Sequence, residues 1–362
     1  MAESYLPGIP PIYKKEVRYM FWSKDDILER LSKIPRTLED ISIEVFESVP
    51  RNACFEQANL EQASVEKELT YPCMDVSLSN EYVIHSSQYR FMLPYEIIGL
   101  DIKKEYRIFQ PDELKTKFPM AYKQLIENES EFGNEKERFN SVDCYRLKNE
   151  SFLQYINTPK IIVTSAYNLQ ASYDPVGEHI FADGVGVVLG DPTLYHYVTA
   201  ILNSSVSKAF PEIWGREQGQ YRSKLCTEML KRFPIVFPKT QTTENLVSTI
   251  SRYQIYLNRQ KHEAKVYPIP CYQRLIDFYK RISDLLILDT YMTNDLDPRL
   301  LEILAENITP FDERLEYGDD ISLLIGLQAI KENVLGSPDF RKCKFSNEFT
   351  NILATLKNNS AW

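Results

Sequence analysis

The chain has 362 residues, more than one domain of average size needs, so we expect two or more packed units. Hydrophobic residues make up 43% and charged residues 26% of the sequence, which excludes a disordered or fibrous chain. The 42 Lys and Arg against 51 Asp and Glu give a net charge of −9, the wrong sign for a protein that coats nucleic acid nonspecifically. Only 12 residues are glycine, which leaves few of the loops that wrap nucleotide phosphates, so we expect no nucleotide cofactor.

The six cysteines show no CxxC spacing and the four histidines are dispersed, so we expect reduced thiols and no metal site. The N-terminal segment MAESYLPGIPP has neither the basic nor the apolar region of a signal peptide. No run of about 18 apolar residues occurs in the sequence. These features predict a cytoplasmic protein with no membrane partner.

The first part of the chain predicts one helix followed by strands. Ser23 is a suitable N-cap for a helix that Pro35 ends. Between residues 40 and 80, short apolar runs alternate with polar residues, as in half-buried strands, and segments 82–84 and 89–93 have the composition of two further strands.

Helical spacing begins at Pro111, where a proline and two acidic residues mark a helix start. Phe118–Pro119 breaks this helix and starts another, which predicts a broken helical pair.

Two β-branched runs, 160–165 and 185–189, predict central strands of a sheet. Asp191–Pro192 then provides an N-cap and a first-turn proline for a helix. Its predicted inner face consists of Leu194, Val198, Ile201, Leu202 and Val206.

After Pro238 the pattern is mostly helical, so we predict an α+β protein with a β-rich domain over residues 1–238 and a helical region over 239–362. Charge divides along the same line. Residues 208–239 carry seven Lys and Arg against three Asp and Glu, whereas residues 284–348 carry six against fourteen.

No catalytic motif stands out in the sequence. The glycines of segment 183–190 precede or lie within a strand, whereas a phosphate loop needs them after one, and no serine lies in a GxSxG context. The Asp112–Glu113–Lys115 grouping lies on consecutive residues of one predicted helix, which excludes a PD-(D/E)xK nuclease site.

The segment from Trp214 to Lys224 is polar and aromatic, and we interpret it as a loop that contacts DNA. Arg216, Arg222 and Lys224 suit phosphates or guanine, and Gln218 and Gln220 suit adenine edges. Trp214 and Tyr221 fit either packing anchors or base-stacking groups. The alternative interpretation is an ordinary solvated loop.

The order of motifs in this part of the chain resembles the C-terminal specificity domain of TaqI-type N6-adenine DNA methyltransferases and the related type IIG restriction-modification enzymes. The motifs that carry this resemblance are Lys160–Ile161–Ile162, Ala200–Ile201–Leu202–Asn203–Ser204, Gly219–Gln220–Tyr221–Arg222 and Phe233–Pro234–Ile235. Upstream, Tyr89–Tyr95 and the helix pair beginning at Asp112 are similar to the family's strand and helix pair, and downstream Phe278–Tyr291 is similar to its closing helix.

The chain departs from this family in three respects. The Asn-Pro-Pro-Tyr motif and the glycine-containing S-adenosylmethionine loop of the catalytic half are missing from the sequence. The family's glycine-rich turn corresponds here to residues 47–55, which contain no glycine. Residues after about 295 correspond to nothing in the family.

The resemblance implies a non-catalytic target-recognition subunit of a restriction-modification or related phage-defence system, which binds double-stranded DNA for a separate adenine methyltransferase or restriction subunit. The expected DNA-binding residues are Arg51, Asn52, Asn168, Gln170, Lys208, Arg216, Gln218, Gln220, Tyr221, Arg222 and Lys224, with Lys231 and Arg232 as further phosphate contacts. Three alternatives remain open: a degenerate specificity domain that binds the modification enzyme but not DNA, a detached part of a longer enzyme, and an independent enzyme.

Overall fold

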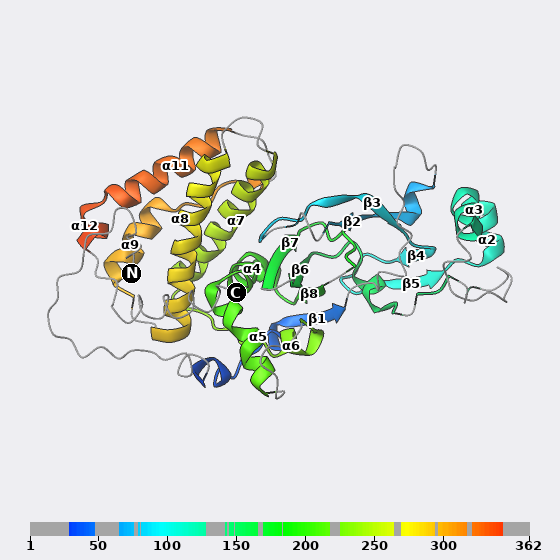
Figure 1. Ribbon diagram of the computed structural model, residues 1–362, viewed down its shortest axis with the longest axis horizontal. Helices are drawn as coiled ribbons and strands as arrows, with labels where there is room; N and C mark the ends of the chain where they lie inside the picture. Colours follow the sequence, from blue (N-terminus) through cyan, green and yellow to red (C-terminus); the bar gives the residue numbers. More distant parts are fainter. Residues whose placement is uncertain are drawn as a thin grey trace, which may run out of the picture. The chain divides into compact units, whose positions relative to one another are not determined.

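The computed structural model describes residues 29–47, 65–75, 79, 81–127, 142, 145–147, 149–165, 169–182, 184–217, 225–263, 269–293, 296–316 and 321–342. The protein has an α+β fold and divides into two compact units (Figure 1). The helical unit combines Met1–Asp40, Asp191–Lys224 and Arg232–Trp362, and the sheet unit combines Ile41–Gly190 and Leu225–Lys231. None of the described helices is long and apolar enough to cross a membrane.

The sheet unit is built around a four-stranded antiparallel sheet. Its order is β1 (Ser42–Glu47), β8 (Val185–Leu189), β6 (Lys160–Ser165) and β7 (Leu169–Asp174). Both predicted central strands, β6 and β8, are therefore confirmed, because each has a neighbour on both sides.

Two further antiparallel pairs lie in the same unit, β2 (Thr70–Met74) with β3 (Ser86–Met92) and β4 (Tyr95–Ile98) with β5 (Glu105–Ile108). The predicted strand at 82–84 is wrong, because Tyr82 lies outside the strands and is joined to Ser172 by an isolated bridge. Its φ of 76° lies in the left-handed region, which interrupts an extended strand.

The broken helical pair is confirmed as α2 (Pro111–Lys117) and α3 (Pro119–Glu127). Both oxygens of the Glu66 carboxylate accept hydrogen bonds from the first turn of α3, from the backbone N–H groups of Met120 and Ala121 at 3.0 Å each. These bonds satisfy two of the N–H groups that a helix start leaves without an intrahelical partner.

The remaining elements in the described part of the sheet unit are short. They are η3 (Lys67–Leu69), η6 (Ser151–Tyr155) and α6 (Thr227–Lys231), and α6 packs against β1. The core around the main sheet includes Phe46, and its ring packs directly against the backbone of Gly186 on the neighbouring strand. A Cβ at Gly186 would come within 2.4 Å of that ring, so this strand position requires glycine.

The second segment of the helical unit begins at Asp191, which is the predicted helix N-cap. The Asp191 carboxylate accepts a hydrogen bond from the Thr193 N–H at 2.9 Å and opens η7 (Pro192–Leu194), which continues into α4 (Tyr195–Leu202). All eight residues of α4 are buried, since α4 packs against α7 inside this unit. The helix is therefore enclosed on every side, not only on the predicted inner face.

Helices form most of the described part of this unit, with α7 beside α8 and with α9 and α11 packed against them (Figure 1). The bounds are α5 (Ser205–Glu217), α7 (Gln241–Glu263), α8 (Ile269–Leu288), the π-helical turn η8 (Asp289–Thr293), α9 (Pro298–Asn307), α10 (Glu313–Glu316), α11 (Ile321–Gly336) and α12 (Pro338–Lys342). A short turn, η1 (Glu39–Ile41), precedes β1.

The two compact units do not meet at the boundary predicted near Pro238. The chain passes between them after Asp40, Gly190, Lys224 and Lys231. Residues 191–217 precede that boundary but belong to the helical unit, because α4 packs on α7 and α5 packs on α8. Asp284 in α8 accepts hydrogen bonds from the backbone N–H and the hydroxyl of Ser205, at 2.9 and 2.7 Å. A buried carboxylate of α8 thus caps the first turn of α5, and a linear reading of composition does not detect such a contact.

Candidate functional site

The first four residues of the predicted DNA-contacting loop are helical, and residues 218–224 lie outside the described residues. Residues 214–217 are the last turn of α5, not part of a loop. Sequence alone disfavours this helix, because it contains Pro211 and Gly215. Burial of Phe210 and Trp214, one turn apart on the same face, supports the helix through both unfavourable positions.

Trp214 is buried, and the guanidinium of Arg232 lies 5.3 Å from the centre of its ring. This contact fits the packing interpretation of Trp214 and the stacking of an arginine on an aromatic face. Arg232, predicted to contact phosphate, is thereby held beside the end of α5.

The structure describes three of the eleven predicted DNA-binding residues, together with the two further predicted phosphate contacts, Lys231 in α6 and Arg232. Gln170 lies half-buried in β7 opposite Thr164, within the sheet unit. Lys208 and Arg216 lie on α5 of the helical unit, Lys208 half-buried. The others lie outside the described residues: Arg51, Asn52, Asn168, Gln218, Gln220, Tyr221, Arg222 and Lys224.

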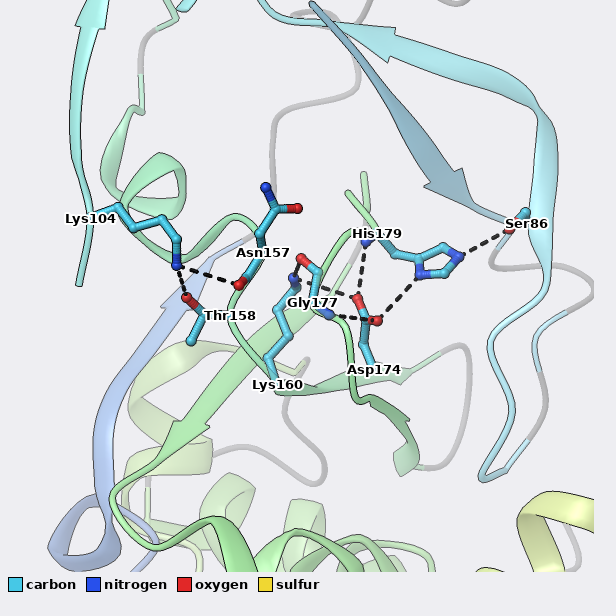
Figure 2. Close-up of polar contacts among 8 residues, drawn as sticks. All are labelled: Ser86, Lys104, Asn157, Thr158, Lys160, Asp174, Gly177 and His179. Carbon is cyan, nitrogen blue, oxygen red and sulfur yellow. Dashed lines mark hydrogen bonds and ion pairs between the residues drawn. The ribbon is translucent and has the colours of Figure 1, made fainter. Parts of the chain in front are cut away.

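A polar cluster that the sequence did not indicate lies at one end of the main sheet (Figure 2). Lys160, the first residue of β6, stands directly opposite Asp174, the last residue of β7. The Lys160 Nζ lies 3.5 Å from the Asp174 Oδ2 and donates a hydrogen bond to the Gly177 carbonyl. Both charged side chains are buried, with 3% and 2% of their surfaces exposed, so each depends on the other for charge compensation.

The Asp174 carboxylate also organises the turn that follows β7. It accepts hydrogen bonds from the backbone N–H groups of Gly177, at 2.9 Å, and His179, at 3.0 Å. Gly177 has a φ of 76°, and a Cβ there would lie 2.0 Å from the Thr158 carbonyl oxygen. Only glycine fits this position, for both reasons.

The surroundings of the pair determine its pKa values. Burial lowers the pKa of Lys160, although the Asp174 charge opposes the shift. Burial acts to raise the pKa of Asp174, but the contact with His179 and the charge of Lys160 outweigh it and leave this pKa below its usual value. The carboxylate therefore stays ionised beside the lysine.

Asp174, His179 and Ser86 form a chain of contacts with the composition of a catalytic triad (Figure 2). The His179 Nε2 lies 3.0 Å from the Ser86 Oγ, and its Nδ1 lies 3.4 Å from the Asp174 Oδ1.

Three observations oppose a catalytic role for this chain of contacts. The contact between His179 and Asp174 is longer than the roughly 2.6–3.2 Å expected between a catalytic base and its partner. The Asp174 oxygens are already engaged by two backbone N–H groups and by Lys160. Ser86 is the first residue of β3, opposite Met74 of β2, and does not lie on the sharp strand-to-helix turn that carries the nucleophilic serine of GxSxG enzymes. We therefore assign these residues a structural role.

A second lysine ties the β4–β5 hairpin to the same end of the sheet. The Lys104 Nζ donates to the Thr158 Oγ1 at 2.8 Å, to the Asp101 carbonyl at 3.2 Å and to the Asn157 carbonyl at 3.4 Å. The Thr158 hydroxyl in turn donates to the Ile102 carbonyl at 2.9 Å. Lys104 and Thr158 thus hold the hairpin turn through its backbone carbonyls.

An aromatic pocket adjoins the buried pair. Its lining includes Phe46, Phe152, Tyr155 and Phe181, with Lys160 and His179 as polar members, and Phe46 stacks on Tyr155 with ring centres 5.3 Å apart. Its volume of about 240 Å³, open solvent included, is below the roughly 300–1,000 Å³ of small-molecule sites. We interpret the rings as packing. Among the described residues, no group of three or more His, Cys, Asp or Glu could hold a metal ion.

No protein-family model matches the chain, and no curated protein is significantly similar to it. The resemblance to the specificity domains therefore depends on the ordered motifs alone.

Proposed function

We propose that the protein is a cytoplasmic, non-catalytic target-recognition subunit that reads a short duplex DNA sequence for a separate adenine methyltransferase or nuclease. The observation that carries this proposal is the order of the motifs in the chain. The order of elements supports it. The motif at 160–162 opens strand β6, the motif at 200–204 ends helix α4, and the glycine-tyrosine-arginine motif follows α5.

The distribution of charge favours a division of labour along the chain. Residues 208–239 carry a local charge of +4, which suits contact with DNA phosphates. Residues 284–348 carry a local charge of −8, which makes the approach of DNA unfavourable and suits a protein partner. Replacing exposed carboxylates of this part by amides, as in Glu302→Gln, Glu306→Gln and Glu332→Gln, should therefore weaken binding to the enzyme subunit without weakening DNA binding.

The chain alone should neither methylate nor cut DNA, because the sequence lacks the adenine-holding and cofactor-holding motifs of such methyltransferases. Transfer of labelled methyl groups to DNA by the purified chain would contradict the proposal. The chain of contacts through Ser86 gives a second check. A fluorophosphonate probe should not label the purified protein at this serine, and labelling that His179→Gln abolishes would show a catalytic triad.

The decisive experiment is a DNA titration over a range of salt concentrations, with the full chain alone and in complex with its enzyme subunit. Arg222→Ala and Lys224→Ala should each weaken binding to all sequences alike and reduce the salt dependence by about one unit of log-log slope. Gln218→Ala and Gln220→Ala should cost about 1–3 kcal/mol on the preferred sequence and little on others.

Lys123→Ala provides the matched control, because this exposed lysine lies on α3, outside the basic segment. It should leave the affinity and the salt slope unchanged. Four loop variants indistinguishable from this control would remove the loop from the DNA interface. A complex with the enzyme subunit that has no affinity for any duplex would instead favour the degenerate specificity domain, with which the net charge of −9 is compatible.

A further inference from the structure

The β4–β5 hairpin and the turn after β7, both in the sheet unit, carry exposed aliphatic side chains. Ile98, the last residue of β4, and Leu100 and Ile102 of the β4–β5 turn are 43%, 101% and 46% exposed. The turn after β7 carries Val176, which is 60% exposed. We call these four residues the turn patch.

Hydrogen bonds connect the two turns to each other. The Thr158 hydroxyl binds the Ile102 carbonyl, and Lys104 binds the carbonyl of the neighbouring Asn157. The Asn157 N–H in turn donates to the Gly177 carbonyl at 3.0 Å, next to Val176 in the chain. Figure 2 shows Lys104, Asn157, Thr158 and Gly177 following one another along this connection.

The buried ion pair fixes the far end of the connection. Lys160 donates to the same Gly177 carbonyl, and Asp174 holds the Gly177 N–H. The backbone beneath the turn patch is therefore bonded on both sides, and its exposed side chains stand on an ordered base. A surface prepared in this way loses little conformational freedom when a partner covers it, which favours binding.

Several exposed apolar side chains on turns that hydrogen bonds connect are typical of binding sites, whereas scattered single exposed hydrophobic residues are ordinary. The charges around the patch distinguish between the possible occupants. Segments 98–105 and 175–178 carry three carboxylates, on Asp101, Glu105 and Glu178, against two lysine ammonium groups. The Lys104 ammonium is held by three oxygen acceptors of the protein itself. This balance disfavours DNA phosphates and suits a protein with an apolar recess and a basic rim.

We infer that the turn patch is a docking surface for the enzyme subunit, with Leu100 entering an apolar recess and the three carboxylates facing basic residues at its rim. This inference rests on the proposed function, because that function requires a separate enzyme subunit. It adds a contact surface in the sheet unit to the acidic C-terminal part already proposed.

The test uses the full chain and the enzyme subunit that co-purifies with it from the native host, each then purified and titrated against the other. Leu100→Asp should raise the dissociation constant at least tenfold, because it places a carboxylate in the apolar recess. Ile126→Asp is the matched control. Ile126 is an exposed isoleucine on α3 of the same unit, 40% exposed, and its substitution should leave the affinity unchanged. Unaltered circular dichroism spectra should show that both variants fold.

A photo-crosslinking amino acid at position 100 identifies the occupant directly, and the expected product joins this residue to the enzyme subunit. Crosslinks to DNA or to a second copy of the chain, an unchanged affinity of Leu100→Asp, or the lack of any co-purifying enzyme would each overturn the inference. If Arg222→Ala weakens DNA binding but Leu100→Asp leaves the complex intact, only the inference fails. If Leu100→Asp breaks a complex that has no DNA affinity, the proposed recognition function fails and the docking surface stands.

Discussion

Replacing Asp174 by asparagine should destabilise the sheet unit by about 3–5 kcal/mol, because it leaves the buried ammonium of Lys160 without its counter-charge. The amide can replace one carboxylate oxygen as an acceptor, but its NH₂ group cannot accept from the second backbone N–H. The lysine can escape the penalty by losing its proton. For an ordinary lysine pKa of 10.5, removing the proton costs about 5 kcal/mol at pH 7, at about 1.4 kcal/mol per pH unit. This cost is the upper limit of the destabilisation that the unpaired lysine can cause.

This limit predicts a pH dependence of the destabilisation. Raising the pH to 9 lowers the cost of deprotonating the lysine to about 2 kcal/mol, so the gap between wild type and Asp174→Asn should narrow at high pH. Asp191→Asn is the matched control. The exposed Asp191 caps a turn in the same way, and asparagine caps well, so this change should cost less than about 1 kcal/mol.

The assay must report on the sheet unit specifically. Trp214, the tryptophan that the structure describes, is buried in the helical unit, so tryptophan fluorescence is not a specific report on the sheet. Hydrogen exchange of peptides that cover β6 and β7, combined with urea unfolding followed by circular dichroism, gives the required local stability. A loss for Asp174→Asn below about 1 kcal/mol, or one that grows with pH, would refute the assignment of a buried ion pair.

Three further predictions concern buried groups within each unit. Asp284→Ala should destabilise the helical unit by about 2–3 kcal/mol in urea unfolding followed by tryptophan fluorescence, because two buried donors of Ser205 lose their acceptor, whereas Ser205→Ala should cost about 1 kcal/mol. Gly177→Ala should cost at least about 2 kcal/mol by hydrogen exchange, since the new Cβ meets the Thr158 carbonyl in a left-handed backbone, and an unchanged exchange rate would contradict this geometry. Burial lowers the pKa of His196 from 6.5 to about 3, so the unfolded state takes up a proton first, and stability present above pH 6.5 should fall by about 1.4 kcal/mol per pH unit between pH 6 and 4. His196→Gln should remove most of that slope, and an identical slope would contradict the prediction.

Local sequence signals predicted the elements whose determinants are local. The β-branched runs of β6 and β8, the Asp191–Pro192 cap and the break at Phe118–Pro119 each depend on residues adjacent in the chain. The structure confirms them for that reason. The prediction of a loop at residues 214–217 was wrong because the low helix propensity of Pro211 and Gly215 opposed a helix there. The contacts that support this end of α5 come from later in the chain, where the Phe233 ring packs against Phe210 and Arg232 lies over the Trp214 ring.

The domain boundary could not be predicted for a related physical reason. The composition changes near Pro238, but the helical unit also takes in residues 191–217, since these helices bury their surfaces against α7 and α8. Whether a helix such as α4 is buried on all sides depends on the elements that pack around it. The helix α7, which packs on α4, begins some forty residues later in the sequence. Of the candidate recognition residues, the sequence could name the types suited to DNA contact, but not which of them share a surface.

The buried pair was missed although the sequence contained a usable signal. A lysine at the start of an apolar run is typical of a strand end exposed to solvent, so the sequence did not predict that Lys160 is buried. The Asp174–Pro175–Val176–Gly177 segment, however, has the composition of a turn that begins at an aspartate. Had segment 169–174 been taken as the second strand of a tight hairpin, counting back from the three intervening residues would have placed Lys160 opposite Asp174. Register supplies what periodicity cannot. Periodicity predicts which face of the sheet a residue occupies, whereas register predicts which residue lies opposite it on the next strand. Here the register places Lys160 opposite Asp174, and both side chains bind the backbone of Gly177 in the turn after β7.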